Sequence, residues 1–205
     1  MNQLQGKPAI ITGAGTGIGQ GIALGFAREG AKVVLCGRRS DPLAKVAAQI
    51  KQDGGEAIFL TGDVSREEDV ERIVNTTIAN FNSVEILVNN AGIAGGGQIH
   101  QHGIETWDRI MNINLRGPFL MSRAVLPLMR SAQSGHIFNI SSESALEHYP
   151  GNGAYGVSKH ALNALGEYIQ RENQDLGIRV DTICPGMVIS EMSENAPGLV
   201  LENCL

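Results

Sequence analysis

The sequence predicts a three-layer α/β/α protein built on a doubly wound parallel sheet, and two observations lead to that fold class. Short apolar runs rich in β-branched residues alternate with stretches of helical periodicity, as repeated βαβ units do. A glycine-rich loop joins the first apolar run to the first helical stretch, as in phosphate-binding folds. Because right-handed crossovers bring the carboxyl ends of the strands to one edge, the residues that follow the strands should share one crevice.

Six strands are expected where the chain is mostly apolar, because a strand covered by helices on both faces has no side that must be polar. The expected strands are residues 9–11, 33–35, 57–60, 86–88, 136–140 and 178–183, and the first helix covers residues 20–28. We expect one domain, residues 1–190, to hold all six strands. Residues 191–205 are expected to form a short C-terminal tail.

The composition narrows the class of protein. At 205 residues and 42% hydrophobic content the chain can form one sizeable core, and 26 glycines suit a loop-rich nucleotide-binding protein. A net charge of -5 without a basic block argues against nucleic-acid and anionic-membrane surfaces, and no apolar run reaches the roughly 18 residues of a transmembrane helix. With no signal-peptide pattern and three scattered cysteines, a cytoplasmic protein is expected.

The loop between the first strand and the first helix reads Gly13-Ala-Gly-Thr-Gly-Ile-Gly19. Glycines allow positive φ and a close approach of pyrophosphate, while the first N–H groups of the helix hold negative charge. The usual dinucleotide fingerprint requires glycine where Ile18 stands, so this is the variant Thr-Gly-x-x-x-Gly-x-Gly. An ordinary tight turn is the alternative. The expected phosphate-binding residues are Gly13, Gly15, Thr16, Gly17, Ile18 and Gly19.

A second constellation combines a phenol, an ammonium and a hydroxyl. Tyr155 and Lys159 lie four residues apart, so on a helix they share one face. The Lys159 ammonium can then lie below the Tyr155 ring and lower the pKa of the phenol from about 10, which makes it a proton donor and acceptor near neutral pH. Ser142, thirteen residues upstream, is the candidate for holding a substrate oxygen. A solvated Tyr-Lys pair on a helix surface is the alternative.

Further motifs follow the later strands. Asn89-Asn90-Ala91-Gly92 follows the fourth apolar run, Asn114 lies in Asn-Leu-Arg-Gly-Pro-Phe, and Pro185-Gly186 follows the sixth run. Together with the glycine loop, Ser142 and the Tyr155 pair, they make the chain resemble the short-chain dehydrogenase/reductase family over essentially its whole length. The resemblance implies a Rossmann-type fold and an oxidoreductase that transfers hydride between nicotinamide C4 and a small carbonyl or alcohol.

The resemblance also implies catalytic roles. Tyr155 would be the general acid/base, and Ser142 would hold the substrate oxygen, so these two are the expected substrate-binding residues. Neighbouring Ser141 competes for the serine role, but the thirteen-residue interval to Tyr155 is the family's. Lys159 would also bind the nicotinamide ribose, and Asn114, through a kink and a water, would connect Lys159 to bulk proton supply. No metal is required.

Cofactor preference is decided at the end of the second strand, where NAD enzymes carry an acidic residue. Here the chain reads Cys36-Gly-Arg-Arg39, and Arg38 and Arg39 can pair with a 2′-phosphate, so NADP is favoured over NAD. Arginines that merely solvate the strand end are the alternative. Asp63 matches the family's adenine contact, or else is a turn carboxylate, with Ser65 as the better cap for the next helix. The other implied cofactor contacts are Val64, Asn90, Ala91, Gly92, Tyr155, Lys159, Pro185, Gly186 and Val188.

The histidines do not form a zinc-like set. His160 is one position away from the face of Lys159 and is expected on the helix surface. His148 and Tyr149 lie between Ser142 and Tyr155 and are candidates for pocket walls, with a solvated loop as the equal alternative.

The end of the sequence departs from the family pattern. Family members continue for several dozen residues past Pro-Gly, with a substrate-covering segment, a helix and a seventh strand, whereas this sequence ends at Leu205. We therefore expect a sheet without the last strand, and a homo-oligomer, dimer or tetramer, whose interface is perturbed. Ser190 stands where the family has threonine. The alternative function is a truncated, catalytically weak dinucleotide-binding protein, and the substrate is not specified by these motifs.

Overall fold

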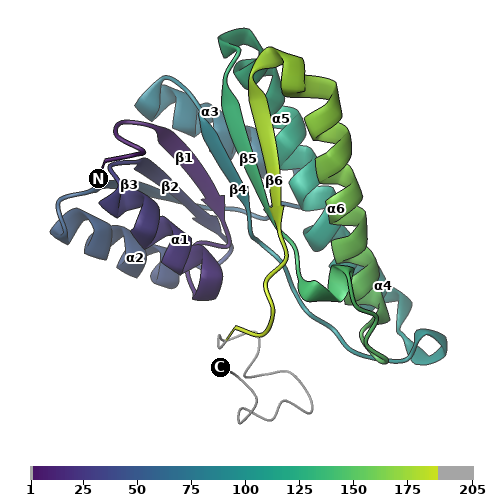
Figure 1. The fold of residues 1–205 in the computed structure, drawn as a ribbon. Helices are drawn as coiled ribbons and strands as arrows, with labels where there is room; N and C mark the ends of the chain where they lie inside the picture. Colours follow the sequence, from purple (N-terminus) through teal and green to yellow (C-terminus); the bar gives the residue numbers. More distant parts are fainter. Residues whose placement is uncertain (1, 189–205) are drawn as a thin grey trace.

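The computed structural model describes residues 2–188, in which six parallel strands form one sheet in the order β3-β2-β1-β4-β5-β6. Figure 1 shows helices on both faces of this sheet. Every expected strand is present, extended at most by one or two residues. The strands are β1 (Pro8–Thr12), β2 (Lys32–Gly37), β3 (Glu56–Thr61), β4 (Ile86–Asn89), β5 (Gly135–Ile140) and β6 (Ile178–Ile183).

The helices divide into two layers. The layer of α1 and α2 packs on one face of the sheet, and α3, α5 and α6 pack on the other. The helices are α1 (Gly17–Arg28), α2 (Ser40–Gln52), α3 (Glu67–Phe81), α4 (Ile104–Met111), α5 (Gly117–Ala132) and α6 (Gly153–Asn173). Shorter segments are η1 (Ile99–Gln101), the π-helical η2 (Asn112–Arg116), η3 (Glu143–Ala145) and η4 (Gln174–Leu176).

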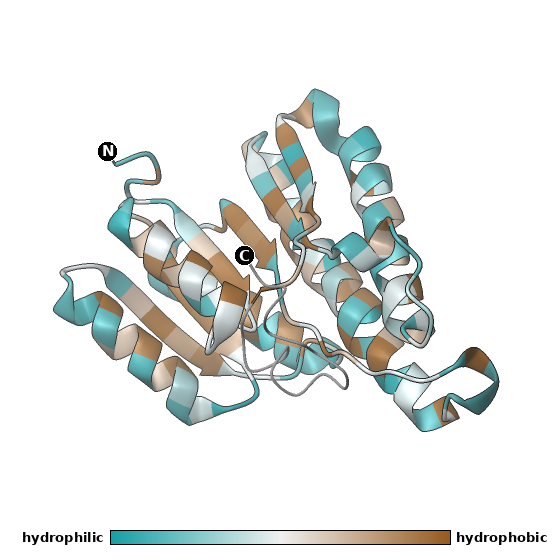
Figure 2. Ribbon diagram, turned by 60° about the horizontal axis from the view of Figure 1, so that its bottom comes forward, coloured by the Kyte–Doolittle hydropathy of each residue, from teal (hydrophilic) through white to brown (hydrophobic). Residues whose placement is uncertain are grey.

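Two apolar cores result from the alternation of side chains along the strands. Ile10 of β1 belongs to the core under α3 and α5, while its neighbour Ile11 belongs to the core under α1 and α2. Both side chains are fully buried, as expected for a strand covered on both faces. Figure 2 shows hydrophobic residues along the central strands and hydrophilic residues on the outer sides of the helices.

The strand order places a crevice at the carboxyl end of the sheet. From β1 the chain first runs outward through β2 and β3, and it then returns to the other side of β1 for β4, β5 and β6. The strand order therefore reverses between β1 and β4, and a ligand site is expected there. The glycine loop follows β1, and Asn90 follows β4, so the two segments face each other across this point.

The start of α3 differs from the expectation. Its N-cap is Arg66, which makes no side-chain capping bond, so Ser65 is not the cap. The Ser65 hydroxyl donates instead to Asp63 Oδ1 at 2.7 Å, and the Ser65 N–H donates to the same atom at 2.9 Å. Asp63 is therefore a turn carboxylate, and Glu67, Glu68 and Asp69 in the first turn offset the helix dipole in place of a serine cap.

Ser190 and the predicted tail, residues 191–205, lie outside the described residues. Within those residues, β6 is one edge of the sheet and β3 is the other. None of the helices in residues 2–188 has the length and apolar character needed to cross a membrane.

Candidate active site

The glycine loop is shaped by close main-chain contacts. Gly13 and Gly17 have φ values of +65° and +56°, the left-handed region that glycine tolerates best. A Cβ at Gly19 would lie 2.3 Å from the Gly13 carbonyl oxygen and 2.4 Å from Asn90 Nδ2. Gly19 therefore allows α1 to pack against the loop and the end of β4, and it does not line the cavity described below.

A polar clasp joins the ends of β1 and β4 below this loop. The Thr12 hydroxyl donates to the Val88 carbonyl and accepts from the N–H groups of Asn90 and Ala91, each at 3.0 Å. The Asn90 amide donates to the carbonyls of Thr12 and Gly13 at 2.9 and 3.2 Å. Asn90 therefore holds the loop from below, and Thr12, the first residue of the pattern Thr-Gly-x-x-x-Gly-x-Gly, has a structural role.

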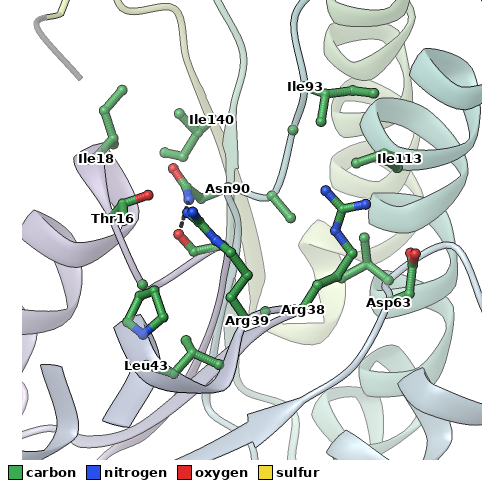
Figure 3. A pocket seen from close by; sticks show the side chains of 18 of the residues that line it. Thr16, Ile18, Arg38, Arg39, Leu43, Asp63, Asn90, Ile93, Ile113 and Ile140 are labelled. Atoms are coloured by element: carbon green, nitrogen blue, oxygen red, sulfur yellow. Dashed lines mark hydrogen bonds between the residues drawn. The ribbon is translucent and has the colours of Figure 1, made fainter. Parts of the chain in front are cut away.

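A cavity of about 260 Å³ extends from this loop across the carboxyl ends of the strands. Figure 3 shows Arg38 and Arg39 extending into it from the segment after β2, with Asp63 at the same end. The glycine loop, which lines the cavity with Gly13, Gly15 and Gly17, and the N-terminus of α1 fit a dinucleotide pyrophosphate. Of the predicted residues, the cavity is lined by Gly13, Gly15, Thr16, Gly17, Ile18, Arg38, Arg39, Asp63, Val64, Asn90, Ala91, Gly92, Tyr155 and Lys159.

Some lining residues were not predicted, and some predicted residues lie elsewhere. Gly37 and Gly62 follow β2 and β3, so the strand-end rule that identified Gly13 could have found them. Pro42 on α2 reaches the cavity only through the crossover. The unpredicted lining residues are Gly37, Pro42, Leu43, Gly62, Ile93, Ile113, Ile140 and Ser141. The predicted residues that are not among the lining residues are Gly19, Asn114, Ser142, Pro185, Gly186 and Val188.

The Tyr155-Lys159 pair lies at the far end of the cavity, on α6. Lys159 Nζ lies 5.7 Å from the centre of the Tyr155 ring, so the two side chains share a helix face as the spacing predicted. Nζ donates to the Ile140 carbonyl at 2.7 Å. Burial lowers the pKa of Lys159 to about 8, while nearby Cys184 acts in the opposite direction.

The pKa of Tyr155 is raised, not lowered, which corrects the expectation from the sequence. Burial of the phenol is the main cause, because a buried phenolate loses its hydration. A hydrogen bond with the Ser142 side chain acts in the opposite direction. Proximity to Lys159 therefore does not by itself produce a phenol that ionises near neutral pH. The Ser142 contact lowers the pKa of the phenol and so acts in favour of the phenolate.

The turn that carries Ser142 packs directly on α6. The Ser142 hydroxyl accepts from the Ser144 N–H at 3.1 Å and begins η3. A Cβ at Gly156 would lie 3.1 Å from the Ser144 carbonyl oxygen, so glycine lets the turn approach the helix. His160 is exposed as expected, but its Nδ1 lies 2.8 Å from the Ala145 carbonyl oxygen and ties the turn to α6.

Two further hydroxyl and amide groups hold the catalytic end together. The buried Ser141 hydroxyl donates to the Lys159 carbonyl at 3.2 Å, so it is engaged with main chain, whereas Ser142 contacts the phenol. Asn114 lies in the π-helical η2, which is the expected kink. Its amide pairs with both main-chain groups of Ile93 at 2.9 Å and donates to Ser158 Oγ at 3.0 Å. Asn114 thus fixes the segment after β4 against α6.

The segment after β6 closes the catalytic end on one side. The Glu143 N–H donates to the Pro185 carbonyl at 2.9 Å, and the Ser141 N–H donates to the Ile183 carbonyl at 2.7 Å. Pro185 and Gly186 are therefore held beside η3, while Val188 is exposed. Burial raises the pKa of the Cys36 thiol to about 12, so it is a core side chain. Residues 2–188 contain no cluster of three His, Cys, Asp or Glu side chains suited to a metal.

The sheet, its strand order and the crevice at its switch point define a Rossmann-type protein. The family model described as short chain dehydrogenase matches residues 7–198. An uncharacterized oxidoreductase of Thermotoga maritima is 42% identical over 187 residues, which are 91% of this chain and 74% of the relative. Another from Staphylococcus saprophyticus is 39% identical over 195 residues, 94% of this chain and 83% of the relative.

A solved structure agrees with these matches. The crystal structure of levodione reductase superposes with a TM-score of 0.92 at 31% identity, covering 94% of this chain and 76% of that one. This chain therefore belongs to the short chain dehydrogenase family and is an oxidoreductase of that family, whose members use NAD(P) and act on small substrates.

Proposed function

We propose that this protein transfers hydride between nicotinamide C4 of NADP and a small carbonyl or alcohol, with Tyr155 as general acid/base. The observation that supports this most directly is that Tyr155 and Lys159 line one end of the cavity and that Ser142 contacts Tyr155 there. A protein that only bound dinucleotides would have no use for a half-buried phenol beside a serine.

The proposed roles follow from the contacts. The nicotinamide of a bound cofactor supplies or accepts the hydride. Ser142 holds the substrate oxygen, and Tyr155 gives a proton to that oxygen in reduction and takes it back in oxidation. Lys159, held by the Ile140 carbonyl, binds the nicotinamide ribose and, while protonated, favours the phenolate. Asn114 keeps the segment after β4 in place beside Lys159.

The preference for NADP rests on the segment after β2. Arg38 and Arg39 both line the cavity, and no carboxylate stands between β2 and Arg39. Two guanidinium groups at this end favour a 2′-phosphate over the bare ribose that an acidic residue would bind. Assembly as a homo-oligomer and a cytoplasmic location are further proposals, carried by the family resemblance and by the composition.

Replacing the proposed acid/base tests the proposal. Tyr155→Phe removes the proton donor and leaves the ring, so we expect kcat to fall by ~10²-fold or more while NADPH affinity is nearly unchanged. The measurement is NADPH oxidation with a panel of ketones, sugars and acyl thioesters, together with a fluorescence titration of NADPH. Tyr168→Phe is the matched control, because Tyr168 lies on the same helix and is 68% exposed.

Three outcomes separate the readings. Near-wild-type turnover in Tyr155→Phe would remove the phenol from the mechanism. A wild type that binds NADPH but turns over nothing in either direction would favour the dinucleotide-binding alternative. A protein that binds neither NADPH nor NADH would contradict both.

A further inference from the structure

A carboxylate stands directly beside the proposed catalytic serine. Glu143 follows Ser142 in the chain, and its Oε1 accepts a hydrogen bond from the Tyr149 phenol at 3.1 Å. Its Oε2 lies 3.1 Å from the point where a Cβ at Gly186 would be. The carboxylate therefore lies between the segment that precedes α6 and the segment that follows β6, outside the set of residues that line the cavity.

The position of Glu143 is fixed by its main chain as well. Its N–H donates to the Pro185 carbonyl at 2.9 Å, and its carbonyl accepts from the N–H groups of Leu146 and Glu147 at 2.8 Å. The side chain is only half-buried, and the phenol that contacts it is neutral, so that contact leaves the negative charge uncompensated. The contact also raises the pKa of Tyr149, which keeps that phenol protonated.

The two segments that flank the carboxylate carry exposed apolar side chains. Leu146, Tyr149 and Met187 are 62%, 47% and 53% exposed, and they belong to the same two segments that enclose Glu143. One charged acceptor within an apolar rim suits a molecule with a hydrocarbon body and one donor group. Because Glu143 directly follows Ser142, with Cα atoms about 3.8 Å apart, we place such a donor a few bonds from the oxygen that Ser142 holds.

We propose that Glu143 determines substrate specificity by accepting a hydrogen bond from a hydroxyl or ammonium group that the substrate carries a few bonds from its reacting carbon. The inference rests on the proposed function, because it needs Ser142 and Tyr155 to act on the carbonyl or alcohol. Tyr149 holds one carboxylate oxygen and so orients the other. The substrate class is a hydroxy or amino ketone, or the corresponding diol or amino alcohol.

The test is a matched series of secondary alcohols, CH3–CH(OH)–(CH2)n–X, in which X is methyl, hydroxyl or ammonium and n runs from one to four. Oxidation is followed by the formation of NADPH or NADH. For at least one n we expect kcat/KM to be about ten- to a hundredfold higher with a donor than with methyl, the range of a charge-assisted hydrogen bond. Glu143→Gln should reduce the ammonium preference at least fivefold.

Glu147→Gln is the matched control, because it removes the same charge from the same turn and should leave the ratio unchanged. Each ratio is taken on one enzyme sample, so a partly unfolded variant lowers both rates and not their quotient. Tyr149→Phe should keep or increase the ammonium preference, because the carboxylate loses a competing donor.

The outcomes separate this inference from the proposed function. Turnover of the alcohols without any preference for a donor, or an ammonium preference that survives Glu143→Gln, would overturn the inference and leave the proposed function standing. An absence of turnover with every member would overturn both. A preference for ammonium alone identifies a cationic substrate, and equal preference for hydroxyl identifies a polyol; both support the inference.

Discussion

The two ends of the crevice are built from different parts of the chain. At the glycine-loop end the walls are mainly main chain. Gly13, Gly15 and Gly19 are critical there because a Cβ at any of them would collide with a neighbouring atom. At the catalytic end the walls are side chains, with Lys159 4% exposed and Tyr155 hydrogen-bonded to Ser142. The first end therefore depends on shape, and the second depends on which groups are ionised.

The largest effect on activity is expected from a substitution at the catalytic end. Lys159→Met should lower kcat by ~10²-fold or more and should also weaken NADPH binding by about tenfold, because the ammonium is assigned to both the phenol and the ribose. The measurements are steady-state kinetics and fluorescence titration. Unchanged cofactor affinity would contradict the dual role and would confine Lys159 to the catalytic step.

The same residue gives opposite pH dependences for activity and stability. Its pKa in the folded protein is about 8, below its ordinary value of 10.5, so between these values the unfolded chain binds more protons. The free energy of unfolding of the wild type should therefore rise, relative to Lys159→Met, as the pH increases from 8 to 10. Over the same window kcat/KM should fall in the wild type as the ammonium is lost. Chemical denaturation and pH profiles measure the two curves.

The next largest effect is expected on cofactor affinity, at the segment after β2 that carries Arg38 and Arg39. The wild type should bind NADPH about ten- to a hundredfold more tightly than NADH, the range of one guanidinium-phosphate contact, and Arg38→Asp should erase or reverse the difference. Titration of both cofactors by nicotinamide fluorescence measures it. Equal affinities in the wild type would mean that the arginines only solvate the end of β2.

The last substitution acts on shape alone. Gly19→Ala inserts a Cβ 2.3 Å from the Gly13 carbonyl oxygen, so it should lower the free energy of unfolding by about 1 to 3 kcal/mol and weaken NADPH binding. Gly21→Ala is the control on the same helix, because nothing lies within 4 Å of its Cβ, and it should stabilise by about 0.5 to 1 kcal/mol.

Thermal melts with NADPH sharpen this contrast. At a hundredfold excess over its dissociation constant, a ligand that binds only the folded state stabilises by about 2.7 kcal/mol. The wild type and Gly21→Ala should show this protection, and Gly19→Ala should show less at the same concentration. Equal protection of all three would mean that the glycine loop does not form the phosphate site.

The sequence alone determined the strands and the positions of the motifs relative to them. All six strands, the loop after β1 and the shared helix face of Tyr155 and Lys159 follow from local periodicity, which acts over a few residues. The resemblance to the family, confirmed by the matches, rests on the same short patterns taken in order. The rule that residues at strand ends line the crevice could also have predicted Gly37 and Gly62, although these two glycines were not identified.

Only the tertiary structure decided which of these residues contact one another and which line the cavity. Thr12 and Asn90 are 78 residues apart and meet through the reversal of strand order. Gly19 packs against Gly13 and Asn90 instead of lining the cavity. The Ser141 hydroxyl donates to the Lys159 carbonyl, whereas the Ser142 side chain contacts the phenol of Tyr155. Burial raises the pKa of Tyr155. Because burial depends on contacts with segments distant in the sequence, the spacing of Tyr155 and Lys159 does not predict this shift.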